Sequence, residues 1–386
     1  WTSRLACAKP QPYFVEHHGR NHPPPQHRSM FMNSSDQIHR LGFGEFVALM
    51  ALVSSLAALS TDAMLPAFPA IVTDLGIDRQ NDVQFVISVL FLGMAVGQVL
   101  FGPISDSCGR KPAVYAGYIV YMAGCLLSMF SANLTMMLIG RFLQGFGIAG
   151  PRSVSMALIR DLHGGSEMAR IMSFIMSVFI LVPIVAPALG QGILLVADWR
   201  AIFGSFLLLS VISVIWFGIR QPETLLPARR MPYSLGRILS AAWEVMHTRS
   251  ALGFTIAAGL ASGGFFGYLS SSQQIFQDTY LVGDRFSLFF GILASAIGLA
   301  TFTNGKMVVK FGMRSMSTWA LRTQVVLSTA FFVLASLQEG VPAFWSFMVY
   351  MMITFFCLGI LFGNLNALAM EPLGHIAGVG AAVVGS

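Results

Sequence analysis

The sequence predicts an all-α integral membrane protein with about ten complete transmembrane helices and the start of an eleventh. Only 10% of its 386 residues are charged and 55% are hydrophobic, whereas about 25% of the residues in soluble domains are charged. The mean hydropathy is +0.70, and several apolar runs reach the length of about 20 residues that crosses a bilayer. These observations exclude a soluble globular protein and a protein with a single membrane anchor.

The apolar runs between charged or Gly/Pro-marked breaks define the spans in order. They lie near 44–66, 83–103, 113–131, 134–158, 167–196, 200–219, 250–279, 286–308, 317–337 and 343–370. A further run begins after Pro372 and reaches only about 12 residues before Ser386, too few to cross about 30 Å at 1.5 Å per residue. We therefore interpret the chain as truncated and expect the complete gene to encode about 60 to 80 further residues.

Residues 1–43 precede the first span and have the composition of a disordered tail. The stretch Pro23–Pro25 interrupts it, and it contains no apolar run that would form a signal peptide. Because the chain begins at Trp1 while Met30 and Met32 stand close to the first span, we interpret the tail as sequence upstream of the working protein.

The positive charges predict a cytoplasmic N-terminus. With that orientation, 18 of the 23 Lys and Arg residues lie in the tail and the inner turns, and three lie in the outer turns. The net charge of +6 therefore describes membrane topology and does not indicate nucleic-acid binding. The four cysteines form no CxxC pair, so we expect neither a disulfide framework nor a metal site.

A glycine–glycine–basic pattern after the second span recurs after the eighth span, with every member offset by 203 residues. Its members are Gly102, Gly109 and Lys111, and then Gly305, Gly312 and Arg314. The recurrence predicts two parallel six-helix halves, at 44–219 and 250–386, the second incomplete, joined by a cytoplasmic linker at 220–249. The alternative is that short basic turns with glycine are common between membrane helices.

The turn after the second span carries the most specific motif. Residues 102–111, GPISDSCGRK, resemble the signature loop of the major facilitator superfamily. Gly102 and Gly109 keep the glycine pattern of that loop, and Asp106 can accept the positive end of a neighbouring helix or a basic side chain. Arg110 and Lys111 are expected at the anionic leaflet. The resemblance implies that the loop latches the cytoplasmic side of the two halves; a solvated basic turn is the alternative.

Two ionisable residues stand inside predicted spans. Residues 138–147, LIGRFLQGFG, resemble the family's fourth-helix motif, whose buried arginine, here Arg141, is linked to proton coupling. Residues 60–66, STDAMLP, resemble the first-helix motif of drug/proton antiporters and contain Asp62. A charge at mid-membrane costs roughly 2.5 to 3.5 kcal/mol and normally faces a partner. Because both charges fall in the outer half of the bilayer, we expect them to pair, either for proton coupling or as a structural ion pair.

Residues 183–192, PIVAPALGQG, resemble the fifth-helix motif that distinguishes exporters within the superfamily. Pro183, Pro187 and Gly190 keep its kinked, small-residue character, while Ala186 and Gln191 stand where glycines are commonest. A kink that serves packing alone is the alternative.

The resemblance runs from about residue 44 to Ser386 and is greatest to the Bcr/CflA branch of multidrug efflux transporters. It implies a major facilitator fold of two six-helix halves, located in the bacterial inner membrane. The implied activity is proton-coupled efflux, by alternating access, of small amphipathic drugs such as bicyclomycin or chloramphenicol-type compounds. Helix position suggests a cavity lined by Met64, Phe265, Tyr268, Asn364 and Asn366, although a packing role is equally open for each.

Other functions are less well supported. Residues 145–150 satisfy the dinucleotide fingerprint GxGxxG but lie inside an apolar helix, where glycines let helices approach closely. The sequence contains no Walker motif, no HExxH and no histidine in the middle of a span, so we expect no enzyme, cofactor or metal. The expected partners are a small-molecule drug, protons and the bilayer, and we expect a monomer. Import or export of a small metabolite on the same fold is the alternative.

Overall fold

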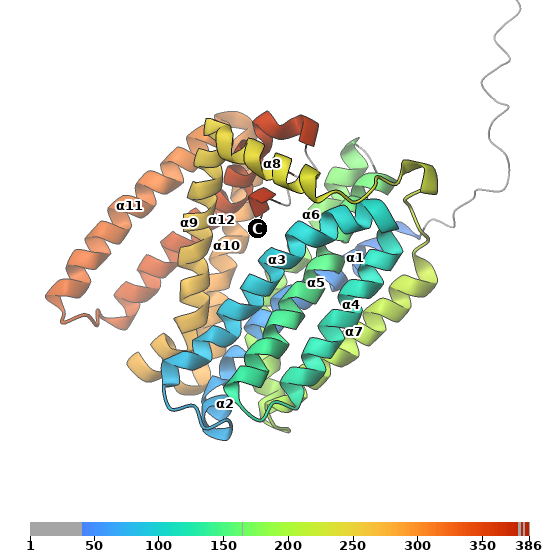
Figure 1. Cartoon of the computed structure of the whole chain (residues 1–386). Coiled ribbons are helices and arrows are strands. Elements are labelled where there is room, and N and C mark those ends of the chain that lie inside the picture. The colour runs from blue at the N-terminus through green and yellow to red at the C-terminus, as the bar shows by residue number, and fades with distance from the viewer. Residues whose placement is uncertain (1–40, 164, 377–379, 381–382, 386) are drawn as a thin grey trace, which may run out of the picture. The chain divides into compact units, whose positions relative to one another are not determined.

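The computed structural model describes residues 41–163, 165–376, 380 and 383–385. Within these residues every regular element is a helix, as Figure 1 shows. The predicted all-α fold is therefore confirmed. The tail predicted at 1–43 lies almost wholly outside the described residues.

The α-helices match the predicted spans to within a few residues at most ends. Their bounds are α1 Phe43–Asp62, α2 Phe68–Asp74, α3 Phe85–Cys108, α4 Arg110–Met129, α5 Leu134–Leu162, α6 Gly165–Leu194, α7 Arg200–Arg220, α8 Leu235–His247, α9 Arg249–Gln274, α10 Phe286–Phe311, α11 Met313–Leu337 and α12 Phe344–Met370. Of the run after Pro372, the described residues 380 and 383–385 are helical. The sequence did not predict α8, which lies within the linker at 220–249.

Two helices, α1 and α9, have interruptions at their C-terminal ends. The first predicted span at 44–66 stops as an α-helix at Asp62 and continues through the short 3₁₀ turn η1, Leu65–Ala67, into α2. Pro66 and Pro69 each lack a backbone N–H and so favour helix starts over helix interiors. At the end of α9 the chain widens into a π-helical segment, η4, Ile275–Thr279.

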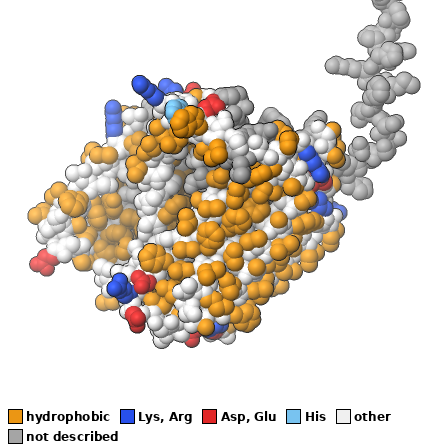
Figure 2. All heavy atoms as spheres, in the orientation of Figure 1, with side chains coloured by type: hydrophobic (Ala, Val, Ile, Leu, Met, Phe, Trp, Pro, Cys, Tyr) orange, Lys and Arg blue, Asp and Glu red, His pale blue; other side chains and the backbone are white. Residues whose placement is uncertain are grey.

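Apolar side chains cover the sides of the helices on the face shown in Figure 2, and most charged side chains there lie toward the ends. Within the described residues, eight helical segments are long and apolar enough to cross a membrane. In lipid every backbone polar group must be satisfied inside the protein, which long helices achieve. The chain is therefore a multi-pass membrane protein.

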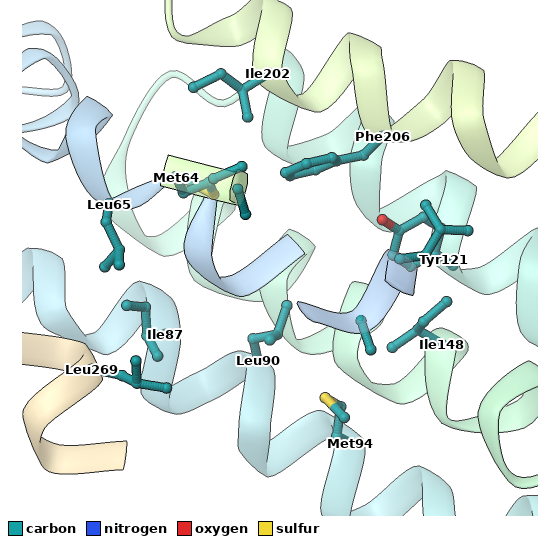
Figure 3. Close-up of a cluster of buried hydrophobic side chains, with 14 of the residues drawn as sticks. Met64, Leu65, Ile87, Leu90, Met94, Tyr121, Ile148, Ile202, Phe206 and Leu269 are labelled. Carbon is teal, nitrogen blue, oxygen red and sulfur yellow. The ribbon is translucent and has the colours of Figure 1, made fainter. Parts of the chain in front are cut away.

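Glycines set the closest helix contacts in the core. A Cβ atom on Gly145 of α5 would overlap the carbonyl oxygen of Leu90 in α3, and one on Gly147 would overlap the backbone of Tyr121 in α4. The glycines of the GxGxxG stretch therefore serve helix packing, as the sequence predicts. Around them lies a cluster of buried hydrophobic side chains, part of which Figure 3 shows.

The two junctions that carry the repeated glycines share a conformation. Gly109 between α3 and α4 has φ +109°, and Gly312 between α10 and α11 has φ +76°. Such angles favour glycine because a Cβ atom would be strained. The arginines that follow pair with acids near the ends of α5 and α12: Arg110 with Asp161 at 2.9 Å, and Arg314 with Glu371 at 3.2 Å. The 203-residue offset pairs Gly109 with Gly312, whose backbone angles are alike, but it pairs Arg314 with Lys111 and not with Arg110.

Candidate functional site

Asp62 occupies the last position of α1, directly before the break at η1. Its side chain is buried, with 4% exposed, and its Oδ1 has no hydrogen-bond partner among the described residues. The hydroxyl of Tyr268 in α9 is likewise buried without a hydrogen bond among those residues. An ionised carboxylate buried without a partner is costly, so this position favours a carboxyl group that can bind a proton.

Arg141 of α5 is fully buried but does not form the predicted ion pair. Its Nε donates to the backbone oxygen of Val86 at 3.0 Å, its Nη2 to the backbone oxygen of Ser60 at 2.7 Å, and its Nη1 to Gln144 Oε1 at 2.6 Å. Within the described residues, no ion pair joins Arg141 to Asp62. The expectation of a direct pair is therefore wrong for this structure, because carbonyl and amide oxygens engage all three donor nitrogens.

The Arg141 bonds form part of a buried polar network that ties α1, α3, α4 and α5 together. Ser60 Oγ lies 2.6 Å from the hydroxyl of Tyr121 in α4 and donates to the Leu56 oxygen at 2.7 Å. Ser60 is two residues before Asp62, so the network fixes the backbone that carries the acid. The sequence motifs include Ser60, Arg141 and Gln144, but nothing in the sequence indicates Tyr121.

The fifth-helix motif lies against the backbone beside Asp62. A Cβ atom on Gly190 of α6 would overlap the carbonyl oxygen of Ala63, whereas one on Gly192 would meet nothing within 4 Å. Pro183 and Pro187 lie inside α6 and remove two backbone donors from its helix ladder. Near Pro183 on the same helix, Ile184 lies against Gly291 of α10. Thus α6 contacts both the acid-bearing helix and a later helix.

The loop at 102–111 forms a compact charged cluster. Arg110 Nη1 lies 2.6 Å from Asp106 Oδ1, and Arg110 Nε lies 2.9 Å from Asp161 Oδ2. Asp106 thus accepts from a basic side chain, one of the two predicted possibilities. Lys111 Nζ donates to the oxygen of Gly218 at 2.9 Å. The remaining predicted residue, Gly102, is half-buried in α3.

Glu223, which the sequence analysis did not single out, closes this cluster from the segment after α7. Its two carboxylate oxygens accept the backbone N–H groups of Arg110 and Lys111, each at 2.9 Å, at the start of α4. Burial alone would raise the pKa of Glu223, but hydrogen bonds from the backbone N–H groups of Leu225, Lys111 and Arg110 outweigh it and lower the pKa. Glu223 is therefore ionised at neutral pH and stabilises the positive end of α4.

The candidate cavity residues do not form one lining. Met64 is fully buried and points toward Ile202 and Phe206 of α7 in Figure 3, so it packs in the core in this structure and does not line a cavity. Phe265 and Tyr268 of α9 form an aromatic group with Phe355 of α12, with ring centroids 5.6 and 4.9 Å from it.

The two candidate asparagines have different surroundings. Asn364 is buried and exchanges two side-chain hydrogen bonds with Asn304 of α10, at 3.0 and 2.9 Å. Asn366 is exposed and donates to the oxygen of Phe362 at 2.7 Å. Asn364 therefore joins two helices, while Asn366 keeps its acceptor oxygen available.

A ladder of polar contacts, here called the polar seam, joins the 3₁₀ segment η2, Gln80–Gln84, and the start of α3 to the end of α9 and η4. Successive turns of the two antiparallel helices meet. At the end of this contact farthest from Gln80, the ring of Phe91 stacks on that of Phe266, with centroids 3.9 Å apart. The hydrogen-bonded pairs are Gln80–Asp278, Asn81–Gln274, Gln84–Gln274, Gln84–Ser271 and Ser88–Ser270, at 2.6 to 3.4 Å. Beside it, a cavity of about 10 Å³ has room for roughly one water molecule.

Within the described residues, no group of three or more His, Cys, Asp or Glu side chains is placed to hold a metal ion.

Comparisons with known proteins agree with the helical architecture. The family model described as Major Facilitator Superfamily matches residues 50–386. The chain is 30% identical over 340 residues to an uncharacterized MFS-type transporter, YdgK, of Bacillus subtilis, covering 87% of this chain and 84% of that protein. It is also 30% identical to the bicyclomycin resistance protein homolog of Haemophilus influenzae, over 88% and 85%.

More distant likenesses extend to multidrug resistance protein MdtL of Salmonella heidelberg, at 27% identity over 84% of this chain and 80% of that protein. Among solved structures, a D-xylose-proton symporter superposes with a TM-score of 0.63 at 15% identity over 88% of each chain. The human organic anion transporter MFSD10 gives a TM-score of 0.55 at 18% identity, over 90% and 97%. At such low identity these structures show the fold alone.

Proposed function

Because this chain belongs to the Major Facilitator Superfamily, we propose that it exports small amphipathic compounds in exchange for protons. The chain is a multi-pass transporter that binds small-molecule substrates, and it is not an enzyme. Two of its relatives carry names that refer to bicyclomycin resistance and to multidrug resistance. Those names support a drug as substrate, and we propose a small amphipathic compound of the bicyclomycin or chloramphenicol type.

The observation that carries the proposal is the buried, unpartnered carboxyl of Asp62. Because no ion pair to Asp62 occurs within the described residues, the buried side chain is most stable when it binds a proton. Release of that proton requires water or a new partner to reach the carboxylate. A change in the packing around α1 would supply this, and so couple protonation to the conformation of the protein.

Contacts around Asp62 connect a change in its packing to other helices. Gly190 of α6 lies directly on the backbone beside the acid. In the proposed cycle, by alternating access, a substrate takes the place of the proton near this junction. Aromatic side chains such as Phe265 suit amphipathic molecules, and the unpartnered Tyr268 hydroxyl can donate to them.

The test measures drug-induced proton movement in inverted membrane vesicles. We expect chloramphenicol-like or dye substrates to collapse the proton gradient with the parent protein and not with Asp62→Asn, because the amide cannot exchange a proton. The matched control is Asp78→Asn, which changes an exposed carboxyl and should respond like the parent.

Each other outcome has a distinct meaning. If Asp62→Asn responds like the parent, the coupling acid lies elsewhere and this proposal is wrong. If no variant responds to a broad drug panel, then transport of a small metabolite becomes the better proposal, and the same vesicles can be tested with sugars and organic anions.

We further propose that the protein is a monomer of the bacterial inner membrane with a cytoplasmic N-terminus, as the charge distribution predicts. In that orientation Cys108, which is exposed beside Arg110, faces the cytoplasm. We expect a membrane-impermeant thiol reagent to modify Cys108 in inverted vesicles and not in intact cells, measured in a Cys7→Ser background. Modification only in intact cells would reverse the assignment.

A further inference from the structure

Tyr121 of α4 carries a buried hydroxyl to which the proposed exchange of protons assigns no role. Its side chain is fully buried, and its hydroxyl lies 2.6 Å from Ser60 Oγ, two residues before Asp62. Figure 3 shows Tyr121 among the buried hydrophobic side chains of the core. A hydroxyl in such surroundings is costly unless it is hydrogen-bonded, so the bond to Ser60 decides whether this tyrosine is tolerated.

The direction of the bond between these two hydroxyls follows from their other partners. Ser60 Oγ has a single proton and donates it to the backbone oxygen of Leu56 at 2.7 Å. The Tyr121 hydroxyl therefore donates to Ser60 Oγ. Phenylalanine at this position would keep the ring and remove the donor that joins α4 to α1.

The α4 backbone that carries Tyr121 is fixed against α5. A Cβ atom on Gly147 would overlap the backbone nitrogen of Tyr121, and one on Gly124 would lie 2.6 Å from the backbone nitrogen of Gln144. Backbones this close leave α4 little room to shift relative to α5. The Tyr121 hydroxyl thus acts from a fixed position, and the end of α1 is the element that its bond restrains.

The end of α1 has few backbone restraints of its own. Asp62 is the last α-helical residue, and the chain continues into the turn at η1, where Pro66 has no backbone N–H. Ser60 Oγ and Thr61 Oγ1 each donate to a backbone oxygen four residues earlier, at 2.7 and 3.1 Å. Such bonds slightly destabilise and bend helices. Side chains from other helices therefore hold the position of the acid.

Two of these side chains meet at Ser60. Arg141 Nη2 of α5 donates to the Ser60 backbone oxygen at 2.7 Å, and Tyr121 of α4 donates to the Ser60 side chain. Asp62 lies two positions further on, and its Oδ1 has no hydrogen-bond partner among the described residues. Because a buried carboxyl without a partner gains a hydrogen bond from any water that reaches it, a loosened end of α1 would admit water to the acid.

We propose that Tyr121 is a positioning residue that keeps the Asp62 carboxyl away from water until a change elsewhere in the protein releases it. This inference rests on the proposed exchange of protons through Asp62. Tyr121 acts through Ser60 and the backbone of α1, and not by carrying the proton. Loss of its hydroxyl lets protons pass without drug, so that transport becomes poorly coupled and not merely slower.

Tyr118 provides a matched control on the same helix. It is also fully buried, and its hydroxyl lies 2.5 Å from Ser213 Oγ of α7, so Tyr118→Phe removes a similar bond that does not reach α1. The first measurement is the proton leak of inverted vesicles in the absence of drug. We expect Tyr121→Phe to raise the leak about fivefold, which is roughly the effect of one net hydrogen bond on an equilibrium. We expect Tyr118→Phe to leak like the parent.

The double variant Tyr121→Phe with Asp62→Asn connects the leak to the acid. We expect it to leak no more than the parent, because the amide cannot take up or release a proton. A leak that persists in the double variant, or equal leaks in the two tyrosine variants, would overturn the proposal. Failure of the proposed function is a separate result, in which Asp62→Asn alone still responds to drug.

A second measurement does not depend on transport. Hydrogen–deuterium exchange reports how often the backbone opens locally. We expect the amides of residues 61–65 to exchange about fivefold faster in Tyr121→Phe than in the parent or in Tyr118→Phe. Equal exchange in all three proteins would show that Tyr121 does not hold the end of α1.

A serine pair repeats this measurement should Tyr121→Phe fail to fold. Ser60→Ala removes the acceptor of the same bond and should accelerate exchange at residues 61–65 to the same extent. Ser55→Ala, which removes only a bond within α1, should not. Equal exchange in the two serine variants would contradict the role of the bond between α1 and α4.

Discussion

Arg141 and Asp62 are both buried ionisable residues, but their side chains have different surroundings and different roles. Arg141 donates to two backbone carbonyls and one side-chain amide oxygen. These bonds join α1, α3 and α5 close to Asp62. Asp62 has an unpartnered oxygen only two residues beyond one of those carbonyls. The arginine therefore holds the backbone in position, and the carboxyl remains available for exchange.

This division predicts unequal effects on stability. Arg141→Lys should lower the stability of the folded protein by about 2 kcal/mol or more, because buried acceptors lose their donors. Asp62→Asn should cost less than about 1 kcal/mol, because no hydrogen bond is lost. Heat-induced unfolding in one detergent, followed by size-exclusion chromatography, compares the two variants. Equal losses would instead indicate that the two residues form a structural ion pair.

At the scale of helices, glycine positions decide which elements can touch. The glycines of α5 bring its backbone against α3 and α4, and Gly190 brings α6 against the end of α1. The Gly190 contact places α6, and the Arg141 bond to the Ser60 oxygen places α5, beside the backbone that carries Asp62. The short 3₁₀ turn after Asp62 leaves that backbone without a continuous helix.

Gly190 offers a test with a control on the same helix. Gly190→Ala should lower stability by about 1 to 3 kcal/mol, because the added methyl group overlaps the Ala63 carbonyl and forces α1 and α6 apart. Gly192→Ala should change stability by less than about 0.5 kcal/mol, because its Cβ position is open. Measured side by side, similar values for the two variants would contradict the packing role.

At the scale of the whole molecule, the polar seam joins helices that are far apart in the sequence. Beyond the Phe91–Phe266 stack, Gly263 and Gly259 of α9 have no described atom within 4 Å of a Cβ position. The contact between α3 and α9 is thus concentrated at one end. Because amide and hydroxyl pairs exchange readily with water, such a contact can separate at modest cost.

Cross-linking tests whether the seam must open during transport. Ser88 Oγ and Ser270 Oγ lie 3.4 Å apart, so Ser88→Cys with Ser270→Cys, in a chain without other cysteines, should form a disulfide on oxidation. We expect oxidation to reduce transport at least about tenfold and reduction to restore it, because opening must precede substrate exchange. Each single variant should be unaffected. Full activity of the cross-linked protein would show that the seam stays closed throughout the cycle.

The sequence by itself predicted a multi-pass all-α membrane protein and the approximate limits of its long apolar helices, since hydrophobic thickness fixes how long an apolar run must be. It also identified the loop of Arg110, the helix-packing glycines and the acid at Asp62, because these depend on local residue type and spacing. Only the tertiary structure decided that Arg141 binds carbonyls, that Met64 packs in the core and that Glu223 closes the charged loop.

The physical reason is the rotation of each helix about its axis. Sequence spacing places Asp62 and Arg141 at a similar depth, but the facing surfaces depend on contacts from α3, α4 and α6, which are distant in the sequence. The same holds for Tyr121: the sequence shows a tyrosine within an apolar helix, while its bond to Ser60 exists only because α1 and α4 both pack against α5.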